Sequence, residues 1–163
     1  NKAQINSKKI IEKEEILQKY AEGLLVKQQA LEESNQELSK LSEEQKALFE
    51  ANISGIIITN KAGKIQKINA SASNLFAHNR SQLIGINITK LIPTLNNLKE
   101  LYIESEKKRY FLDYEGVRQG NERIFVQIMV SQLEQVDVDD IFYSIVVTRS
   151  QPSVLLAKRN QEE

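Results

Sequence analysis

A seven-residue repeat of aliphatic side chains constrains the first third of this chain more than any other feature. The repeat, with two leucines that continue it at an offset of three, consists of Ile10, Leu17, Leu24, Leu31, Leu38, Leu41 and Leu48. Residues 7 to 51 contain no proline and one glycine, and they are rich in strong helix formers. A sustained heptad repeat keeps one helix face against a partner helix. Residues 1–48 are therefore predicted to form a dimerising coiled-coil helix.

The pattern of this helix is uneven. In its first half aliphatic residues come in adjacent pairs, which is typical of a bundle or of a second packing surface. In its second half Leu31, Asn35 and Leu38 form a narrow seam, and an asparagine on a seam fixes the register. Gly23 lies near the change, and whether the helix continues through it stays open. The alternative, a lone solvated helix, would leave seven aliphatic side chains in water, which the hydrophobic effect disfavours.

Residues 49–150 read as a separate α+β domain. Strands are expected at 56–60 and 64–69, joined by a turn in which Gly63 supplies a positive φ. Asn69 is a good N-cap for the helix that follows. The remaining expected elements are helices at 70–76, 81–84, 88–92 and 96–107, and strands at 110–118, 123–132 and 141–149. This order fits a five-stranded antiparallel sheet with short helices on one face.

Two segments resemble a known sensory module. Residues 55–69 followed by 70–85 resemble the start of a PAS domain, with a strand hairpin and then two short helices that end at a glycine. Residues 113–131 resemble its third and fourth strands, because Tyr-Glu-Gly-Val-Arg at 114–118 comes before a glycine-containing turn. The resemblance implies a PAS-like α+β fold. It also implies a module of larger signalling proteins, such as the sensor histidine kinases of bacterial two-component systems.

The usual PAS site is a cavity between the sheet and the helices, and the resemblance implies a ligand pocket there. We expect its wall to consist of Ile58, Ile68, Leu75, Phe76, Leu83, Ile92, Leu95, Leu98, Tyr102, Val126, Ile128, Val130 and Ile145. Such apolar side chains either enclose an unknown small molecule or simply fill the core. The sequence leaves both alternatives open.

The residues that would anchor the known PAS cofactors are missing. The chain has no cysteine for a flavin photoadduct, and residues 96–107 contain no histidine for haem. The single histidine, His78, is interpreted as a surface turn residue, and no cluster has metal-ligand spacing. Asp137, Asp139 and Asp140 read as a solvated loop, because further oxygen ligands for a cation are missing. We therefore expect neither cofactor nor metal.

Catalysis also lacks its usual residues. His78 is followed by Asn79 rather than by the acidic residue of an autophosphorylation site, and the glycines are too scattered for a phosphate-binding loop. We expect this fragment not to be an enzyme, although the parent protein can be a histidine kinase or another signalling enzyme. An unrecognised active site remains the third alternative.

The sheet is expected to be apolar on both faces. Side chains alternate along a strand, so Phe125 and Met129 lie opposite Val126, and Val146 lies opposite Ile145. Helices can cover one face only, so the outer face must meet the N-terminal helix, a second copy or both, unless its apolar residues are singly exposed. The residues expected to dimerise or to relay the signal are Leu24, Leu31, Asn35, Leu38, Leu41, Leu48, Phe125, Met129 and Val146.

Charge and hydropathy limit the partners further. Lys plus Arg equals Asp plus Glu at 22 each, so no basic field favours nucleic acid or an anionic membrane. No apolar run approaches the ~20 residues that span a bilayer, and we expect a cytoplasmic location. The chain begins at Asn1 without methionine, so we expect an effector domain in cis outside it, reached through a linker over 151–163 that contains Pro152. The alternative to a homodimeric sensor or relay is a pure assembly module with a filled core.

Overall fold

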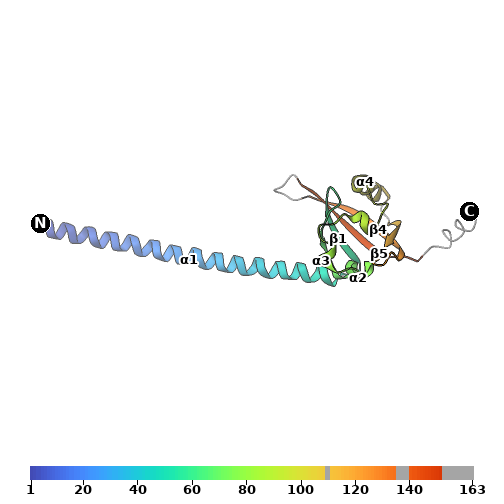
Figure 1. The fold of residues 1–163 in the computed structure, drawn as a ribbon. Coiled ribbons are helices and arrows are strands. Elements are labelled where there is room, and N and C mark those ends of the chain that lie inside the picture. The colour runs from blue at the N-terminus through green and yellow to red at the C-terminus, as the bar shows by residue number, and fades with distance from the viewer. Residues whose placement is uncertain (109–110, 135–139, 152–163) are drawn as a thin grey trace, which may run out of the picture. The chain divides into compact units, whose positions relative to one another are not determined.

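The computed structural model describes residues 1–108, 111–134 and 140–151 (Figure 1). The chain divides into two compact units, with the division between Lys46 and Ala47. The first unit is helical throughout. Helix α1 (Lys2–Ala51) is continuous through Gly23, so the strong helix formers on both sides outweigh the cost of one glycine. None of its side chains is buried in the single chain, including those of the heptad repeat.

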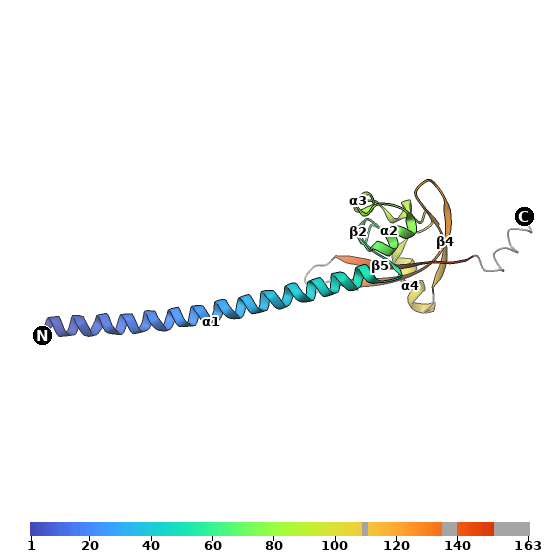
Figure 2. The same ribbon diagram turned by 90° about the horizontal axis from the view of Figure 1, so that it is seen from below.

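The second unit contains a five-stranded antiparallel sheet with strand order β2-β1-β5-β4-β3. Figures 1 and 2 show β4 and β5 of this sheet from two directions. The strands are β1 (Gly55–Asn60), β2 (Ile65–Ile68), β3 (Leu112–Val117), β4 (Arg123–Glu134) and β5 (Ile141–Arg149). The helices are α2 (Ala70–Phe76), α3 (Arg80–Leu83), the 3-10 helix η1 (Ile88–Lys90) and α4 (Leu98–Lys108). The predicted fold class and element order are confirmed. The expected start of the third strand at Tyr110 and the linker from Pro152 onward lie outside the described residues.

The turns follow from residues with special backbone preferences. Gly63 has φ 85° in the β1–β2 turn, where the Asn60 side-chain oxygen accepts hydrogen bonds from the amides of Ala62 and Lys64. Gly120 and Asn121 have φ 86° and 62° in the β3–β4 turn, where the Asn121 amide donates to the Arg118 carbonyl and Gly120 is the second central residue, a position at which positive φ favours glycine. Both predicted turns are therefore present, and they set which side chains of each strand face the helices.

The core lies between the helices and one face of the sheet, the inner face. On β4 the inner residues are Ile124, Val126, Ile128 and Val130, and on β5 they are Tyr143, Ile145 and Val147. The placement of Ile58 in this core was wrong: Ile57 is buried there, whereas Ile58 is half-buried on the opposite face. The contact of Gly55 with α2 decides which residues of β1 face the core. A Cβ at Gly55 would come within 2.9 Å of the Ala72 Cα, so Gly55 packs directly against α2, and Ile57, two residues further along the strand, faces the same side.

Candidate functional site

The core brings together most of the expected pocket residues. Ten of them are buried in one cluster, namely Ile68, Phe76, Leu83, Ile92, Leu95, Leu98, Val126, Ile128, Val130 and Ile145. Leu75 and Tyr102 are partly buried against the same cluster. The prediction missed other members of the wall, which are Ile57, Ile65, Ala72, Ile88, Leu91, Leu101, Ile124, Tyr143 and Val147. The inner wall is thus continuous from β2 to β4.

Hydroxyl groups interrupt this apolar wall. Thr59 is fully buried, its Oγ1 has no hydrogen-bond partner, and it pairs in register with Tyr143 on β5. The Tyr143 ring lies 6.4 Å from that of Tyr102 on α4, measured between centroids. Buried Ser105, also on α4, accepts a hydrogen bond of 3.4 Å from the Val130 amide. A hydroxyl can both donate and accept a hydrogen bond, so Thr59 carries an unused donor and acceptor within the apolar core.

Two phenols of this region have raised pKa values. A hydrogen bond to the Glu106 carboxylate, with burial as a second cause, raises the pKa of Tyr102 above its ordinary value of 10.0. Burial raises the pKa of Tyr114, on the inner side of β3, in the same direction. Both phenols therefore remain neutral donors over the physiological pH range. Of these hydroxyl groups only that of Tyr102 belonged to a predicted pocket residue, because apolar spacing along strands and helices does not indicate a buried hydroxyl.

The outer face of the sheet carries an apolar row across the three central strands. Ile56 on β1 pairs with Val146 on β5, and Val146 pairs with Met129 on β4. Phe125, further along β4, is 40% exposed on the same face, and Ile58 is half-buried there. We call Ile56, Ile58, Phe125, Met129 and Val146 the outer apolar row. Phe125, Met129 and Val146 lie on the face that strand alternation predicted.

Asn69 joins the last turn of α1 to the domain core. Its side-chain oxygen accepts hydrogen bonds from the amides of Ile56 at 2.8 Å and Ala72 at 3.0 Å. Its side-chain nitrogen donates to the carbonyls of Phe49 and Ser54, both at 3.0 Å. One fully buried amide thus connects α1, β1 and α2 and satisfies its own donors and acceptors. The sequence predicted the N-cap bond but not the other three.

Glu50 makes a second connection between the same elements. Its Oε2 accepts a hydrogen bond of 3.0 Å from the Ala70 amide at the start of α2, where a negative charge is favourable. The same oxygen forms an ion pair of 2.7 Å with the Arg80 guanidinium at the start of α3. The Ser71 hydroxyl also donates to the Asn52 carbonyl. We call Glu50, Asn69 and Arg80 the helix–core joint.

Replacing Asn69 by alanine should destabilise the domain strongly. The change leaves the Ile56 and Ala72 amides and the Phe49 and Ser54 carbonyls without their partner, at about 2–4 kcal/mol in free energy of unfolding. Urea unfolding monitored by circular dichroism measures this loss. The matched control is Asn52→Ala, which removes one exposed bond to Ser54 and should change stability by less than about 0.5 kcal/mol. If Asn69→Ala lowered the free energy of unfolding no more than Asn52→Ala, the hydrogen bonds of Asn69 would not stabilise the connection between α1 and the core.

The described residues offer no conventional metal site. Among them no group of three or more His, Cys, Asp or Glu side chains is placed to hold a metal ion. His78 is half-buried in the turn after α2, where its carbonyl accepts a hydrogen bond from the Ser73 hydroxyl. Asp137 and Asp139 of the acidic loop lie outside the described residues. In the same described part of the chain, no helix has the length and apolar character needed to cross a membrane.

A family model described as "PAS domain" matches residues 53–149. This chain belongs to the PAS domain family. The match begins just after α1 and ends at the last residue of β5, so it covers the whole sheet and the helices between β2 and β3. No curated protein sequence matches the chain.

Solved PAS domains have the same fold. A PAS domain from a two-component sensor histidine kinase superimposes with a TM-score of 0.55 at 15% identity, covering 69% of this chain and 99% of that one. The PAS domain of an HTR-like protein from Haloarcula marismortui gives 0.58 at 12% identity, with 73% and 99% covered. The PAS domain of nitrogen regulation protein NR(II) from Vibrio parahaemolyticus gives 0.51 at 14% identity, with 64% and 95% covered. At these identities the similarity establishes the fold alone.

Proposed function

We propose that this PAS domain is a sensory or relay module that works as a homodimer and passes a conformational change to an effector domain in cis. The observation that carries the proposal is the presence of two unpartnered apolar surfaces on one chain. The heptad side chains of α1 are all exposed, and the outer apolar row covers three central strands. Both surfaces are of the kind that a second copy buries.

The helix–core joint provides the physical connection that a relay needs. Asn69 and Glu50 bond simultaneously to the last turn of α1 and to β1, α2 or α3. A change in the core that moves α2 must therefore either move the end of α1 or break these bonds. In a two-stranded coil such a movement becomes a rotation or a change of register, which can be transmitted along the helix.

A neutral small molecule is the signal that the inner wall fits best. The wall is apolar, and its polar groups are uncharged hydroxyls, those of Thr59, Tyr102, Ser105 and Tyr143. The second candidate function is a pure assembly module in which the same side chains only fill the core; the tight burial of Phe76 and Ile145 favours it. A small molecule that stays bound through purification would favour the sensor, and a protein without one would favour the assembly module.

The remaining parts of the proposal follow from composition. We place the protein in the cytoplasm, in keeping with a chain that contains no cysteine, and without nucleic-acid or membrane contact in this fragment, because its charges balance. The fragment itself carries out no reaction and holds no cofactor. The effector is a histidine kinase of a two-component system or another signalling enzyme, in keeping with the relatives whose fold this domain shares.

Phe125→Glu tests the role of the outer apolar row. A carboxylate in the row must be desolvated when a second copy packs against it, so the dimer dissociation constant should rise at least about tenfold while the fold is retained. Sedimentation equilibrium measures the change. Gln66→Glu on β2, an exposed position outside the row, is the control and should leave dimerisation unchanged. A Phe125→Glu protein that dimerises like the control would contradict the role of this face.

A further inference from the structure

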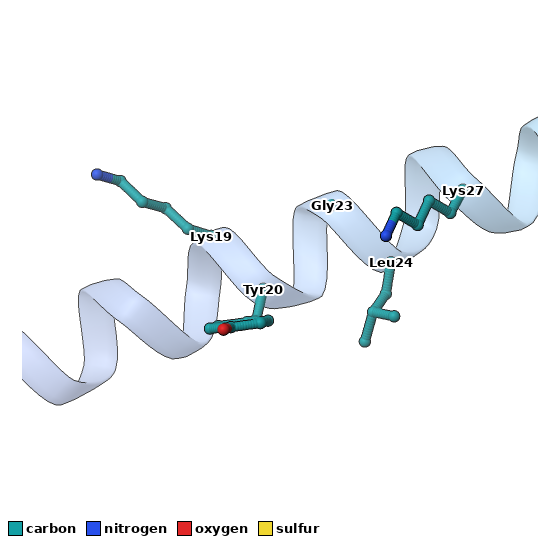
Figure 3. Close-up of a pocket in the computed structure, with 5 residues that line it drawn as sticks. All are labelled: Lys19, Tyr20, Gly23, Leu24 and Lys27. Atoms are coloured by element: carbon teal, nitrogen blue, oxygen red, sulfur yellow. The ribbon is translucent and has the colours of Figure 1, made fainter.

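A hollow on α1 has the shape of a coiled-coil packing site. It measures about 340 Å³ and is lined by Lys19, Tyr20, Gly23, Leu24 and Lys27. Figure 3 shows the Tyr20 ring and the Leu24 side chain leaving the helix on the same side, while Gly23 exposes bare backbone. Tyr20 and Leu24 are 70% and 64% exposed, so nothing in the single chain covers them.

The spacing of the lining residues identifies the kind of site. Tyr20, Gly23, Leu24 and Lys27 stand at i, i+3, i+4 and i+7, so they lie together on one helix face. In a coiled coil each seam side chain inserts into a hole made by four residues of the facing helix. For a parallel pair, the hole that accepts an a-position side chain consists of the facing d, g, a and next d residues. Four of the five lining residues have this composition when Leu24 is at a, and the fifth, Lys19, falls at c on the edge of the hole.

We propose that the hollow receives Leu24 of a second copy, in a parallel and in-register coiled coil with Leu24 at position a. The inference rests on the proposed homodimer and adds its orientation and register. In this register, Ile10, Leu17, Leu31 and Leu38 also occupy a. The offset of three that leads to Leu41 is the step from a to d, so the repeat continues without a break.

One pair of opposite charges flanks the seam in the way that a parallel pair of helices uses. Lys9 falls at g and Glu14 at the following e, the two positions that form ion pairs between parallel helices. Asn35 falls at e, beside the seam, so in this register it does not have the register-fixing position that the sequence pattern suggested. Lys13, Lys27 and Ser34 fall at d, and Gln45 falls at a, so the seam contains several polar residues, which specify pairing at some cost in stability.

The proposed register explains why a glycine stands at position 23, which the single helix does not. A Cβ at Gly23 would meet no atom within 4 Å, so the isolated helix has no steric need for glycine. Glycine is also the poorest helix former after proline. At position g, the missing side chain deepens the hollow between Tyr20 and Lys27. Because both of these side chains are large, the extra depth leaves space for the leucine of the second copy.

Single-cysteine cross-linking of the full chain tests the register. The chain has no cysteine, so each variant can form a disulfide only through the introduced residue. Disulfides need Cβ atoms about 3.5–4.5 Å apart, which seam positions of a parallel pair approach and outer positions do not. We expect Leu24→Cys and Tyr20→Cys to cross-link at least tenfold faster than Ala21→Cys in a glutathione buffer. Glu22→Cys, on the outside of the helix in this register, is the control and should stay at the background rate.

The outcomes separate this inference from the proposed function. Faster cross-linking of Ala21→Cys than of Tyr20→Cys, with the dimer intact by sedimentation, would overturn the register because it places Leu24 at d. A dimer in which no seam variant exceeds Glu22→Cys would overturn the parallel orientation. A monomeric wild-type chain would overturn the homodimer itself, and this inference with it. Rapid cross-linking at both Tyr20 and Leu24 supports the assigned hole.

Discussion

Val126→Glu is expected to unfold the PAS domain. Val126 is fully buried at the centre of β4, so the carboxylate would lie in the core without a partner, at a cost on the order of 4 kcal/mol or more. That cost is a large fraction of the total stability of a domain of this size, which is about 5–15 kcal/mol. Amide chemical-shift dispersion in a proton–nitrogen correlation spectrum should collapse for the residues of the sheet.

The neighbouring substitution Phe125→Glu is the matched control for folding. Phe125 is on the other face and 40% exposed, so its carboxylate stays hydrated. Glu115 is directly opposite on β3, and the like charges should cost only about 0.2–1 kcal/mol. The dispersed spectrum should therefore be kept. If Phe125→Glu collapses the spectrum as fully as Val126→Glu, then the two faces of the sheet are assigned wrongly, and the outer apolar row is not an interaction surface.

The double substitution Leu31→Ala, Leu38→Ala is expected to dissociate the homodimer. Both side chains are more than 60% exposed in the single chain, at 64% and 61%, and both belong to the heptad seam. Truncating a buried leucine costs about 2–5 kcal/mol, so the pair should raise the dimer dissociation constant by at least about a thousandfold. Sedimentation equilibrium over a range of concentrations measures this shift.

The control for this pair replaces two residues on the outer side of the helix. Gln29→Ala and Gln36→Ala are each two positions before one of the leucines, away from the seam, and alanine is a better helix former than glutamine. This variant should dimerise at least as well as the wild type. An unchanged dimer in the Leu31→Ala, Leu38→Ala protein would mean that the globular units associate by themselves and that the heptad repeat is secondary.

Much of the fold could be predicted because its signals are local. The heptad repeat predicted α1, and alternation along β4 predicted which of Phe125 and Val126 faces the core. Gly63 and the glycine that follows residues 114–118 predicted the turns, since few residues adopt positive φ at low cost. Each of these inferences needs only the sequence within one element or turn.

The wrong and missing predictions concern features that the sequence within one element does not determine. Residues 56–58 are three consecutive isoleucines, so alternation could not decide between Ile57 and Ile58; the contact of Gly55 with Ala72 decides it. The four partners of Asn69 come from residues 49 to 72, and their approach depends on the folded arrangement of α1, β1 and α2. Thr59 was not predicted as a wall residue because threonine is common in strands, and only the structure shows that this one is fully buried.

Native mass spectrometry of the full chain measures whether the PAS relay is a homodimer. We expect a dominant species of twice the 18.6 kDa chain mass at low micromolar concentration. An additional constant mass on each chain that is lost on denaturation would identify the small molecule of a sensor, and a bare dimer would favour the assembly module. A spectrum that contains only the 18.6 kDa monomer at these concentrations would rule out the homodimeric relay, because both apolar surfaces would then remain uncovered in solution.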